Sequence, residues 1–211
     1  MILERIVFCD FDGTITARET FVAVLKRFAP ELAAALIPKM YALELTLREG
    51  VQQLLESMPS SAYAEIIEFA ASQPLRAGLP EFLDFLDDRA VPFVVITGGL
   101  QGIVEAAIPA LLPQIHAVHG VEINAEGPYL QVRSPALGDS ELVSKVDIMQ
   151  RYPARQTIAV GDSVTDLKMA LAGDVVFARD RLAEYLGDRD VPYYPWHDFH
   201  DVRETLATLW Q

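Results

Sequence analysis

The sequence predicts an α/β fold, in which a Rossmann-like parallel-sheet core carries an inserted all-helical cap and a small β-hairpin. The first observation is an alternation of short β-branched runs with helical patterns, which is typical of βαβ units. The second is that residues 17–74 contain helical patterns alone. The third is that residues 118–133 have the pattern of an antiparallel hairpin that turns near residues 125–127.

The core is expected to contain at least four strands and three helices. Short apolar runs predict strands at residues 5–11, 92–97, 156–161 and 175–179. Such continuous apolar strands suit a parallel sheet that is covered on both faces. Helical patterns lie at residues 79–90, 142–152 and 164–173.

The helical stretch divides the chain into two expected domains. Residues 1–16 and 75–211 form the core, and residues 17–74 form the cap. Because the cap follows the first strand directly, we expect it above the carboxyl end of that strand, where open α/β sheets bind ligands. The cap therefore has the place of a lid over a binding site.

The composition argues against several classes of function. A formal net charge of −13 at pH 7 disfavours a nucleic-acid or anionic-membrane partner. The single cysteine, Cys9, cannot form an intramolecular disulfide, and no apolar stretch approaches the ~18 residues of a membrane span. We expect a cytoplasmic protein that acts on a small molecule; the sequence does not indicate its oligomeric state.

Four aspartates are placed where strands end. Asp10 and Asp12 follow the first strand, although strands tolerate aspartate poorly and two like charges repel unless a cation or a proton is shared. Asp162 and Asp166 follow the strand at 156–161. Parallel strands end at the same edge of a sheet, so these carboxylates should converge. Oxygen donors without histidine or cysteine favour Mg²⁺.

Four motifs occur in a fixed order: DFDGTIT at 10–16, TGG at 97–99, Lys145, and GDSVTD at 161–166. They resemble the four motifs of the haloacid dehalogenase superfamily, and residues 17–74 stand where that family has its C1-type helical cap. The resemblance covers the whole chain. It implies a Mg²⁺-dependent phosphomonoesterase that acts on a small phosphorylated metabolite through an aspartyl-phosphate intermediate.

The resemblance also implies roles for the aspartates. Asp10 would be the nucleophile, and Asp12 would protonate the leaving oxygen and then deprotonate water. The metal would be held by the side chains of Asp10 and Asp162 and by the backbone carbonyl of Asp12. Asp166 would hold a water of the metal shell or orient Lys145.

The phosphoryl group would be held by neutral and cationic donors. The Thr97 hydroxyl and the Gly98 amide would hydrogen-bond its oxygens, and Gly99 would let the backbone approach closely. Lys145 would neutralise its charge. Each motif alone also has a structural explanation: Asp-Gly is a common turn, GDSVTD fits a helix cap, and a helical lysine normally faces solvent. The common order of all four favours catalysis.

Two cap residues are candidates for substrate binding, Glu19 and Arg48. Glu19 follows Thr16 by three residues, as Glu49 follows Thr46, and both pairs fit a capping box that needs no substrate. Arg48 lies in the first turn of an expected helix, where the helix dipole disfavours a cation. It could face a ligand anion or be a surface arginine.

Similarity within the superfamily suggests a substrate. ITARETF resembles phosphoserine phosphatases, whose glutamate meets the substrate amine and whose cap arginine meets its carboxylate, although their motif usually has serine in place of Gly13. The stretches LREGVQQLLESMPSS, GDSVTDLKMA and VVFARDRL are more similar to the branch that dephosphorylates a methylthio-pentenyl phosphate in methionine salvage. Phosphoserine or another small phosphate ester is the alternative substrate, and a catalytically inactive binding protein is a third possibility.

Overall fold

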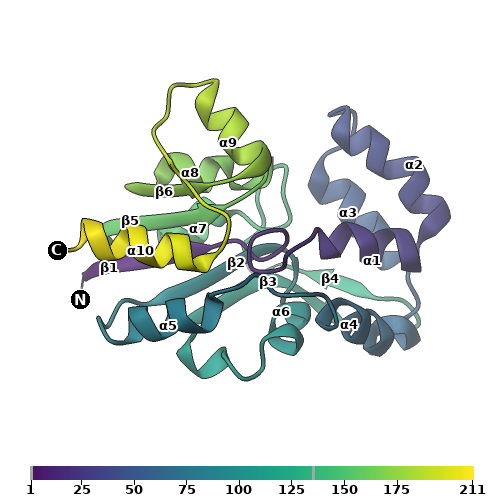
Figure 1. The fold of residues 1–211 in the computed structure, drawn as a ribbon. Helices are drawn as coiled ribbons and strands as arrows, with labels where there is room; N and C mark the ends of the chain where they lie inside the picture. The colour runs from purple at the N-terminus through teal and green to yellow at the C-terminus, as the bar shows by residue number, and fades with distance from the viewer. Residues whose placement is uncertain (1, 135) are drawn as a thin grey trace.

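Among the residues that the computed structural model describes, 2–134 and 136–211, seven strands form one sheet in the order β4-β3-β2-β1-β5-β6-β7 (Figure 1). Neighbouring strands are parallel except for β3 and β4. The strands are Leu3–Cys9 (β1), Phe93–Leu100 (β2), Ala117–Asn124 (β3), Gln131–Arg133 (β4), Ala154–Gly161 (β5), Val175–Ala178 (β6) and Tyr194–Pro195 (β7).

Helices surround the sheet and form the inserted segment. The inserted segment contains α1 (Thr20–Phe28), α2 (Pro30–Tyr41), α3 (Leu47–Glu56) and α4 (Tyr63–Ala71). The remaining helices are α5 (Leu79–Asp87), α6 (Gln101–Ala107), α7 (Lys145–Met149), α8 (Leu167–Ala172), α9 (Asp180–Gly187) and α10 (Phe199–Leu209). In Figure 1, α5 and α6 lie on one side of the sheet and α7, α8 and α9 on the other, as in a doubly wound fold.

The central strand β1 explains the continuous apolar run of the sequence. Ile6, Val7, Phe8 and Cys9 are completely buried, because β1 is paired on both edges and covered on both faces. The expected α/β class is thereby confirmed. The strand ends at Cys9, so Asp10 begins the loop that leaves the sheet.

The hairpin is part of the main sheet. β3 and β4 are antiparallel, with Glu122 opposite Arg133, as the sequence predicts. In addition, β3 pairs in parallel with β2, Ala117 lying opposite Val94, and α6 provides the crossover between them. This pairing is not evident from the sequence. Two expected helices are also shorter: 142–152 reduces to α7, and 164–173 becomes a 3₁₀ turn at Val164–Asp166 followed by α8.

The inserted segment leaves and re-enters the core at one point. Thr16 and Leu75 form an antiparallel bridge, and the Ala17 amide donates to the Pro74 carbonyl at 2.8 Å. Residues 17–74, all of which the structure describes, contain helices and no strand. The Thr46–Glu49 capping box is present. The one expected for Thr16 and Glu19 is wrong, because Glu19 is itself the N-cap of α1 and makes no side-chain capping bond.

The inserted segment is docked on the core at several places. α4 packs against α6, and α3 lies beside β4 (Figure 1). Backbone hydrogen bonds of 3.0 Å join Ser60 to the Pro128 carbonyl and Leu130 to the Met58 carbonyl. Within the described residues, no helix is long and apolar enough to cross a membrane.

Candidate active site

Three aspartates meet at the carboxyl ends of β1 and β5. Cys9 lies opposite Val160 in the sheet, so the residues that follow each strand are neighbours. Carboxylate oxygens of Asp10, Asp162 and Asp166 lie within 4.8 Å of one another, and all three residues are buried. We call these three residues the acidic cluster.

Lys145 reaches the acidic cluster from the first residue of α7. Its Nζ lies 2.5 Å from an oxygen of Asp10 and 2.5 Å from an oxygen of Asp166. Lys145 is only 3% exposed, so the interpretation of a solvated surface lysine is wrong. The helix dipole disfavours a cation at this position, and the two carboxylates compensate for that cost.

Asp166 is held at both carboxylate oxygens. One oxygen accepts from Lys145, and the other accepts from the backbone amides of Asp162 at 3.1 Å and Ser163 at 2.9 Å. Ser163 and Asp166 thereby form the capping box of the 3₁₀ turn, so the helix-cap explanation of GDSVTD is correct for this pair. Asp166 is thus suited to orienting Lys145, one of its two expected roles.

Asp162 is contacted by the turn that follows the nucleophile candidate. The Thr14 hydroxyl donates to Asp162 Oδ1 at 2.6 Å. Gly13 has a φ of +90°, and a Cβ at this position would lie 2.5 Å from Asp162 Oδ2. Only glycine fits both the backbone conformation and the space. The sequence does not predict this contact of Thr14, because a threonine after Asp-Gly is ordinary in a turn.

The side chain of Asp12 is hydrogen-bonded to the start of the inserted segment. Its Oδ1 accepts from the backbone amides of Thr20 at 2.5 Å and Phe21 at 3.0 Å, at the start of α1. This carboxylate therefore satisfies the helix N-terminus that Glu19 leaves uncapped. Among the described residues, the group of acidic side chains that could hold a metal ion consists of Asp10, Asp162 and Asp166, without Asp12. The atom of Asp12 that is expected to bind the metal is its backbone carbonyl oxygen.

The TGG motif ends β2 beside Asp12. Thr97 is buried, and its hydroxyl accepts from the Gly99 amide at 3.0 Å, whereas Gly98 is exposed. A cavity of about 10 Å³ lies between this motif and α1. It is lined by Phe11, Asp12, Thr20, Phe21, Thr97, Gly99, Leu100 and Ile103.

The two candidate residues of the inserted segment lie at different places. Glu19 is exposed and close enough to Asp12 for its charge to raise the pKa of that carboxyl. Arg48 is half-buried, and its Nη1 donates to the Gly138 carbonyl at 3.2 Å. The Arg48 amide donates to the Ser140 carbonyl at 2.9 Å, so this residue connects α3 to the core loop that precedes Lys145.

The acidic groups have raised pKa values. Burial, followed by the charge of Asp166, raises the pKa of Asp10 to about 8, although Lys145 acts in the opposite direction. The same two causes raise the pKa of Asp162 to about 7. Burial would lower the pKa of Lys145, but the charges of Asp10 and Asp166 raise it above its ordinary value. One positive charge, that of Lys145, therefore stands beside three carboxylates, and it cannot neutralise all three when they are ionised.

The pKa of Asp12 is also raised, to about 7. Burial is the main cause and the charge of Asp10 the next, while the amide hydrogen bonds from Phe21 and Thr20 lower it. A carboxyl with a pKa near 7 can donate and accept protons at neutral pH.

The acidic cluster fits a divalent cation. Its donors are buried carboxylate oxygens close enough to share one ion, and the cluster carries more negative charge than Lys145 neutralises. Hard oxygen donors of this kind suit Mg²⁺.

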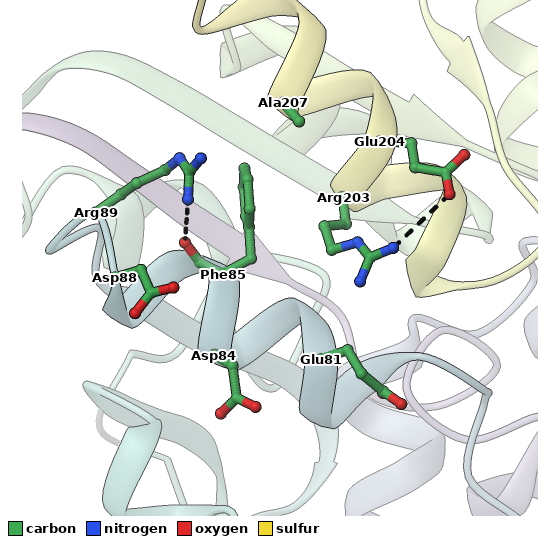
Figure 2. A pocket seen from close by; sticks show the side chains of 8 residues that line it. All are labelled: Glu81, Asp84, Phe85, Asp88, Arg89, Arg203, Glu204 and Ala207. Atoms are coloured by element: carbon green, nitrogen blue, oxygen red, sulfur yellow. Dashed lines mark hydrogen bonds and ion pairs between the residues drawn. The ribbon is translucent and has the colours of Figure 1, made fainter.

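A larger cavity, of about 560 Å³, lies between α5 and α10 (Figure 2). Its lining residues are Glu81, Asp84, Phe85, Asp88, Arg89, Arg203, Glu204 and Ala207. Several of their polar groups already have partners: Arg89 donates to the Phe85 carbonyl, Arg203 pairs with Glu204, and Asp84 accepts from Gln114. It shares no residue with the acidic cluster.

Comparison with known proteins agrees with this geometry. The profile of haloacid dehalogenase-like hydrolases matches residues 7–171. A protein of Microcystis aeruginosa (strain NIES-843 / IAM M-2473), named 2-hydroxy-3-keto-5-methylthiopentenyl-1-phosphate phosphatase, is 52% identical over 206 residues, which cover 97% of this chain and 98% of that protein. A protein of the same name from Bacillus cytotoxicus is 32% identical and covers 96% of each chain.

Solved structures show the same fold. The phosphoserine phosphatase of T. onnurineus superposes with a TM-score of 0.70, covering 96% of this chain and 94% of the other, at 14% sequence identity. The order of the motifs, the acidic cluster at the sheet edge and the profile match over most of the chain lead to one conclusion. This chain belongs to the haloacid dehalogenase-like hydrolase family.

Proposed function

We propose that the protein is a Mg²⁺-dependent phosphomonoesterase whose substrate is 2-hydroxy-3-keto-5-methylthiopentenyl-1-phosphate. The observation that carries the proposal is the buried Asp10 at the end of β1, with Lys145 on one oxygen and Asp162 beside it. A bound Mg²⁺, held by Asp10, Asp162 and the Asp12 carbonyl, would favour the ionised carboxylates and neutralise charge on the phosphoryl group.

The proposed reaction has two steps. In the first, an Asp10 oxygen attacks phosphorus, the bond from phosphorus to the leaving oxygen breaks, and Asp12 gives its proton to that oxygen. In the second, Asp12 takes a proton from water, the water oxygen attacks the same phosphorus, and phosphate leaves Asp10. The raised pKa of Asp12, about 7, suits both directions of proton transfer.

The remaining residues hold the phosphoryl oxygens. Lys145 lies against Asp10 and would contact an oxygen of the group transferred to it. The Thr97 hydroxyl and the Gly98 amide would donate from the end of β2, where Gly99 would let the backbone approach closely. Asp166 would keep Lys145 in place, since both of its oxygens are already engaged.

The substrate assignment is supported by the relatives that carry its name. The Microcystis protein matches almost the whole chain at 52% identity, so the match includes the inserted segment. We propose that residues 17–74 are the cap domain, that residues 1–16 and 75–211 are the catalytic core, and that Glu19 and Arg48 contact the leaving group. The alternative is phosphoserine or another small phosphate ester, which the exposed carboxylate of Glu19 near Asp12 would suit through an amine.

The test is a phosphate-release assay with and without EDTA. Its substrates are the methylthio-pentenyl phosphate, phosphoserine and p-nitrophenyl phosphate. We expect the first to have the highest kcat/KM, EDTA to abolish turnover, and Asp10→Asn to lower kcat by about 10⁴-fold or more. Asp147→Asn, which changes an exposed aspartate of α7, is the matched control and should leave the rate unchanged.

The outcomes separate the parts of the proposal. Full activity in EDTA, or in Asp10→Asn, would overturn the mechanism. A higher kcat/KM for phosphoserine would overturn the substrate while keeping the phosphatase. A chain that hydrolyses none of the three esters would be a binding protein instead.

A further inference from the structure

Arg76 has an unusual set of partners. It lies in the segment that returns from the cap to α5, and its guanidinium is half-buried. Its side-chain nitrogens donate to the carbonyls of Gly13 at 2.5 Å, Thr14 at 2.8 Å and His197 at 3.1 Å, with a longer contact of 3.4 Å to Thr16. All four acceptors are backbone carbonyls, and three of them belong to the turn that follows the proposed nucleophile.

That turn lies between Arg76 and Asp162. Arg76 holds the outer side of the turn through the carbonyls of Gly13 and Thr14. On the inner side, the Thr14 hydroxyl donates to Asp162 Oδ1 at 2.6 Å, and the Gly13 backbone packs against the same carboxylate. A continuous path of hydrogen bonds therefore runs from the guanidinium, through Thr14, to a carboxylate of the acidic cluster.

Arg76 is itself held by the segment before α10. Its guanidinium lies 5.1 Å from the centre of the Trp196 ring, which is almost completely buried. Arg179 contacts the same ring at 5.4 Å and donates to the same carbonyl, that of His197, at 2.9 Å. Arg179 pairs in addition with Asp180, and within the described residues it makes no hydrogen bond to the turn. Both arginines therefore contact Trp196 and the His197 carbonyl, and of these two side chains it is Arg76 that also bonds to residues 13–16.

We propose that Arg76 is a positioning residue for the metal site. It fixes the 13–16 turn so that Thr14 and Gly13 hold the Asp162 carboxylate in the orientation that a divalent cation requires. The inference rests on the proposed function, because it assigns Asp162 to that cation. Groups that orient a metal ligand typically change metal affinity by 10- to 100-fold when they are removed.

The test compares Arg76→Gln with Arg179→Gln. Mg²⁺ binding is measured by calorimetric titration of the substrate-free protein, and stability is measured by thermal unfolding in EDTA. We expect Arg76→Gln to bind Mg²⁺ about 10-fold more weakly than the wild type and to lose kcat, with little change in KM at saturating Mg²⁺. Arg179→Gln should keep Mg²⁺ affinity within about 2-fold of the wild type. The Arg179 side chain contacts Trp196 and the His197 carbonyl, so its removal leaves the hydrogen bonds from Arg76 to the turn in place.

Three further variants test the path itself. Thr14→Val removes the hydroxyl that contacts Asp162 and leaves Arg76 intact, so it should weaken Mg²⁺ binding to a similar extent. When Thr14→Val is combined with Arg76→Gln, the two losses of Mg²⁺ affinity should not add, because both changes break the same path. Arg76→Lys keeps the positive charge but lacks the planar guanidinium, so its Mg²⁺ affinity should lie between those of the wild type and Arg76→Gln.

The results that overturn the inference are distinct from those that overturn the function. Wild-type Mg²⁺ affinity in Arg76→Gln, equal weakening in Arg179→Gln, or additive effects with Thr14→Val would each remove Arg76 from this role. Should Arg76→Gln fail to fold, Arg76→Lys and Thr14→Val decide by the same criterion. A wild-type protein that binds Mg²⁺ but hydrolyses no phosphate ester would overturn the proposed function and leave this comparison valid, whereas one that binds no Mg²⁺ would overturn both.

Discussion

Three buried carboxylates share one buried lysine at the end of β1. Their oxygens lie within 4.8 Å of one another, and Lys145 forms ion pairs with Asp10 and Asp166. Burial removes the water that would otherwise stabilise the ionised forms, so the protein holds these groups at a cost to its own stability. A divalent cation would offset this cost.

The first prediction concerns pH. Asp10 and Asp162 have pKa values of about 8 and about 7 in the metal-free fold, against ~3.9 in an unfolded chain. Between these limits the native chain binds more protons than the unfolded chain, so its free energy of unfolding falls as pH rises from ~4 to ~8. Urea unfolding in EDTA should show a steeper fall for the wild type than for Asp162→Asn, the difference reaching on the order of 2 kcal/mol. Equal slopes would contradict the raised pKa of Asp162.

The second prediction concerns Asp12. Asp12→Asn keeps an oxygen that can accept from the Thr20 and Phe21 amides, so α1 should remain capped. It cannot transfer a proton, and kcat for an alkyl or enol phosphate should fall by about 10²–10⁴-fold. The loss should be much smaller for p-nitrophenyl phosphate, because nitrophenolate leaves without protonation. Steady-state kinetics on both esters provide the measurement, and an equal loss on both would argue against acid catalysis by Asp12.

At the residue scale, the sequence predicts the acidic groups but does not reveal the residues that hold them in place. Asp10 and Asp162 are visible because a carboxylate at the end of a buried strand is rare without a reason, whereas Lys145 is visible only through its place in the order of the four motifs. Arg76 binds carbonyl oxygens, which every residue carries, so no partner residue type marks its contacts. Such a contact is defined by the folded backbone alone.

At the scale of elements, the inserted segment is fixed to the rest of the chain from more than one side. Pro59 forms a bridge with Tyr129 of the β3–β4 connection, and Arg48 of α3 bonds to the core loop before Lys145. These contacts join the inserted segment to the residues that precede α7. A shift of α3 would therefore displace residues close to the proposed site.

The third prediction concerns Arg48. One nitrogen of its guanidinium donates to the Gly138 carbonyl, and a guanidinium has further donors for an anionic or carbonyl group of the substrate. Arg48→Ala should raise KM for the methylthio-pentenyl phosphate by about 10-fold, as expected for the loss of a charged hydrogen bond, and raise it less for p-nitrophenyl phosphate. Arg27→Ala, which removes an exposed cap arginine paired with Glu65, is the control. Equal effects on both esters would assign Arg48 to cap docking alone.

The sequence missed one short helix, α6, and the pairing of the predicted strand β3 with β2, which depends on distant residues. α6 has seven residues, too few for a helical period to stand out from the glycine-rich segment before it. β3 contains His119 and Gly120 within its apolar positions, so its pattern indicates a half-exposed hairpin strand. Its pairing with β2 is decided by the crossover and not by its own residues. The long buried strands β1, β2 and β5, by contrast, are visible in the sequence.

At the scale of the whole molecule, the chain is strongly acidic and the proposed substrate is an anion. The net charge of −13 repels a phosphate ester over distances of about a Debye length, ~8 Å at physiological salt. The same field attracts divalent cations. The attraction for the substrate must therefore come from local groups, Lys145 and the cation that the acidic cluster would hold.

The fourth prediction follows from this field. Added monovalent salt screens the attraction between the acidic protein and Mg²⁺, so the Mg²⁺ concentration at half-maximal activity should rise with ionic strength. KM for the phosphate ester at saturating Mg²⁺ should not rise, because screening also weakens the repulsion between the protein and an anion. Kinetics at low and high sodium chloride, repeated with choline chloride to exclude a specific effect of sodium, provide the measurement. A Mg²⁺ requirement that is constant or falls with salt would show that the net charge has no part in cation binding, and that the acidic cluster attracts its ion through short-range contacts alone.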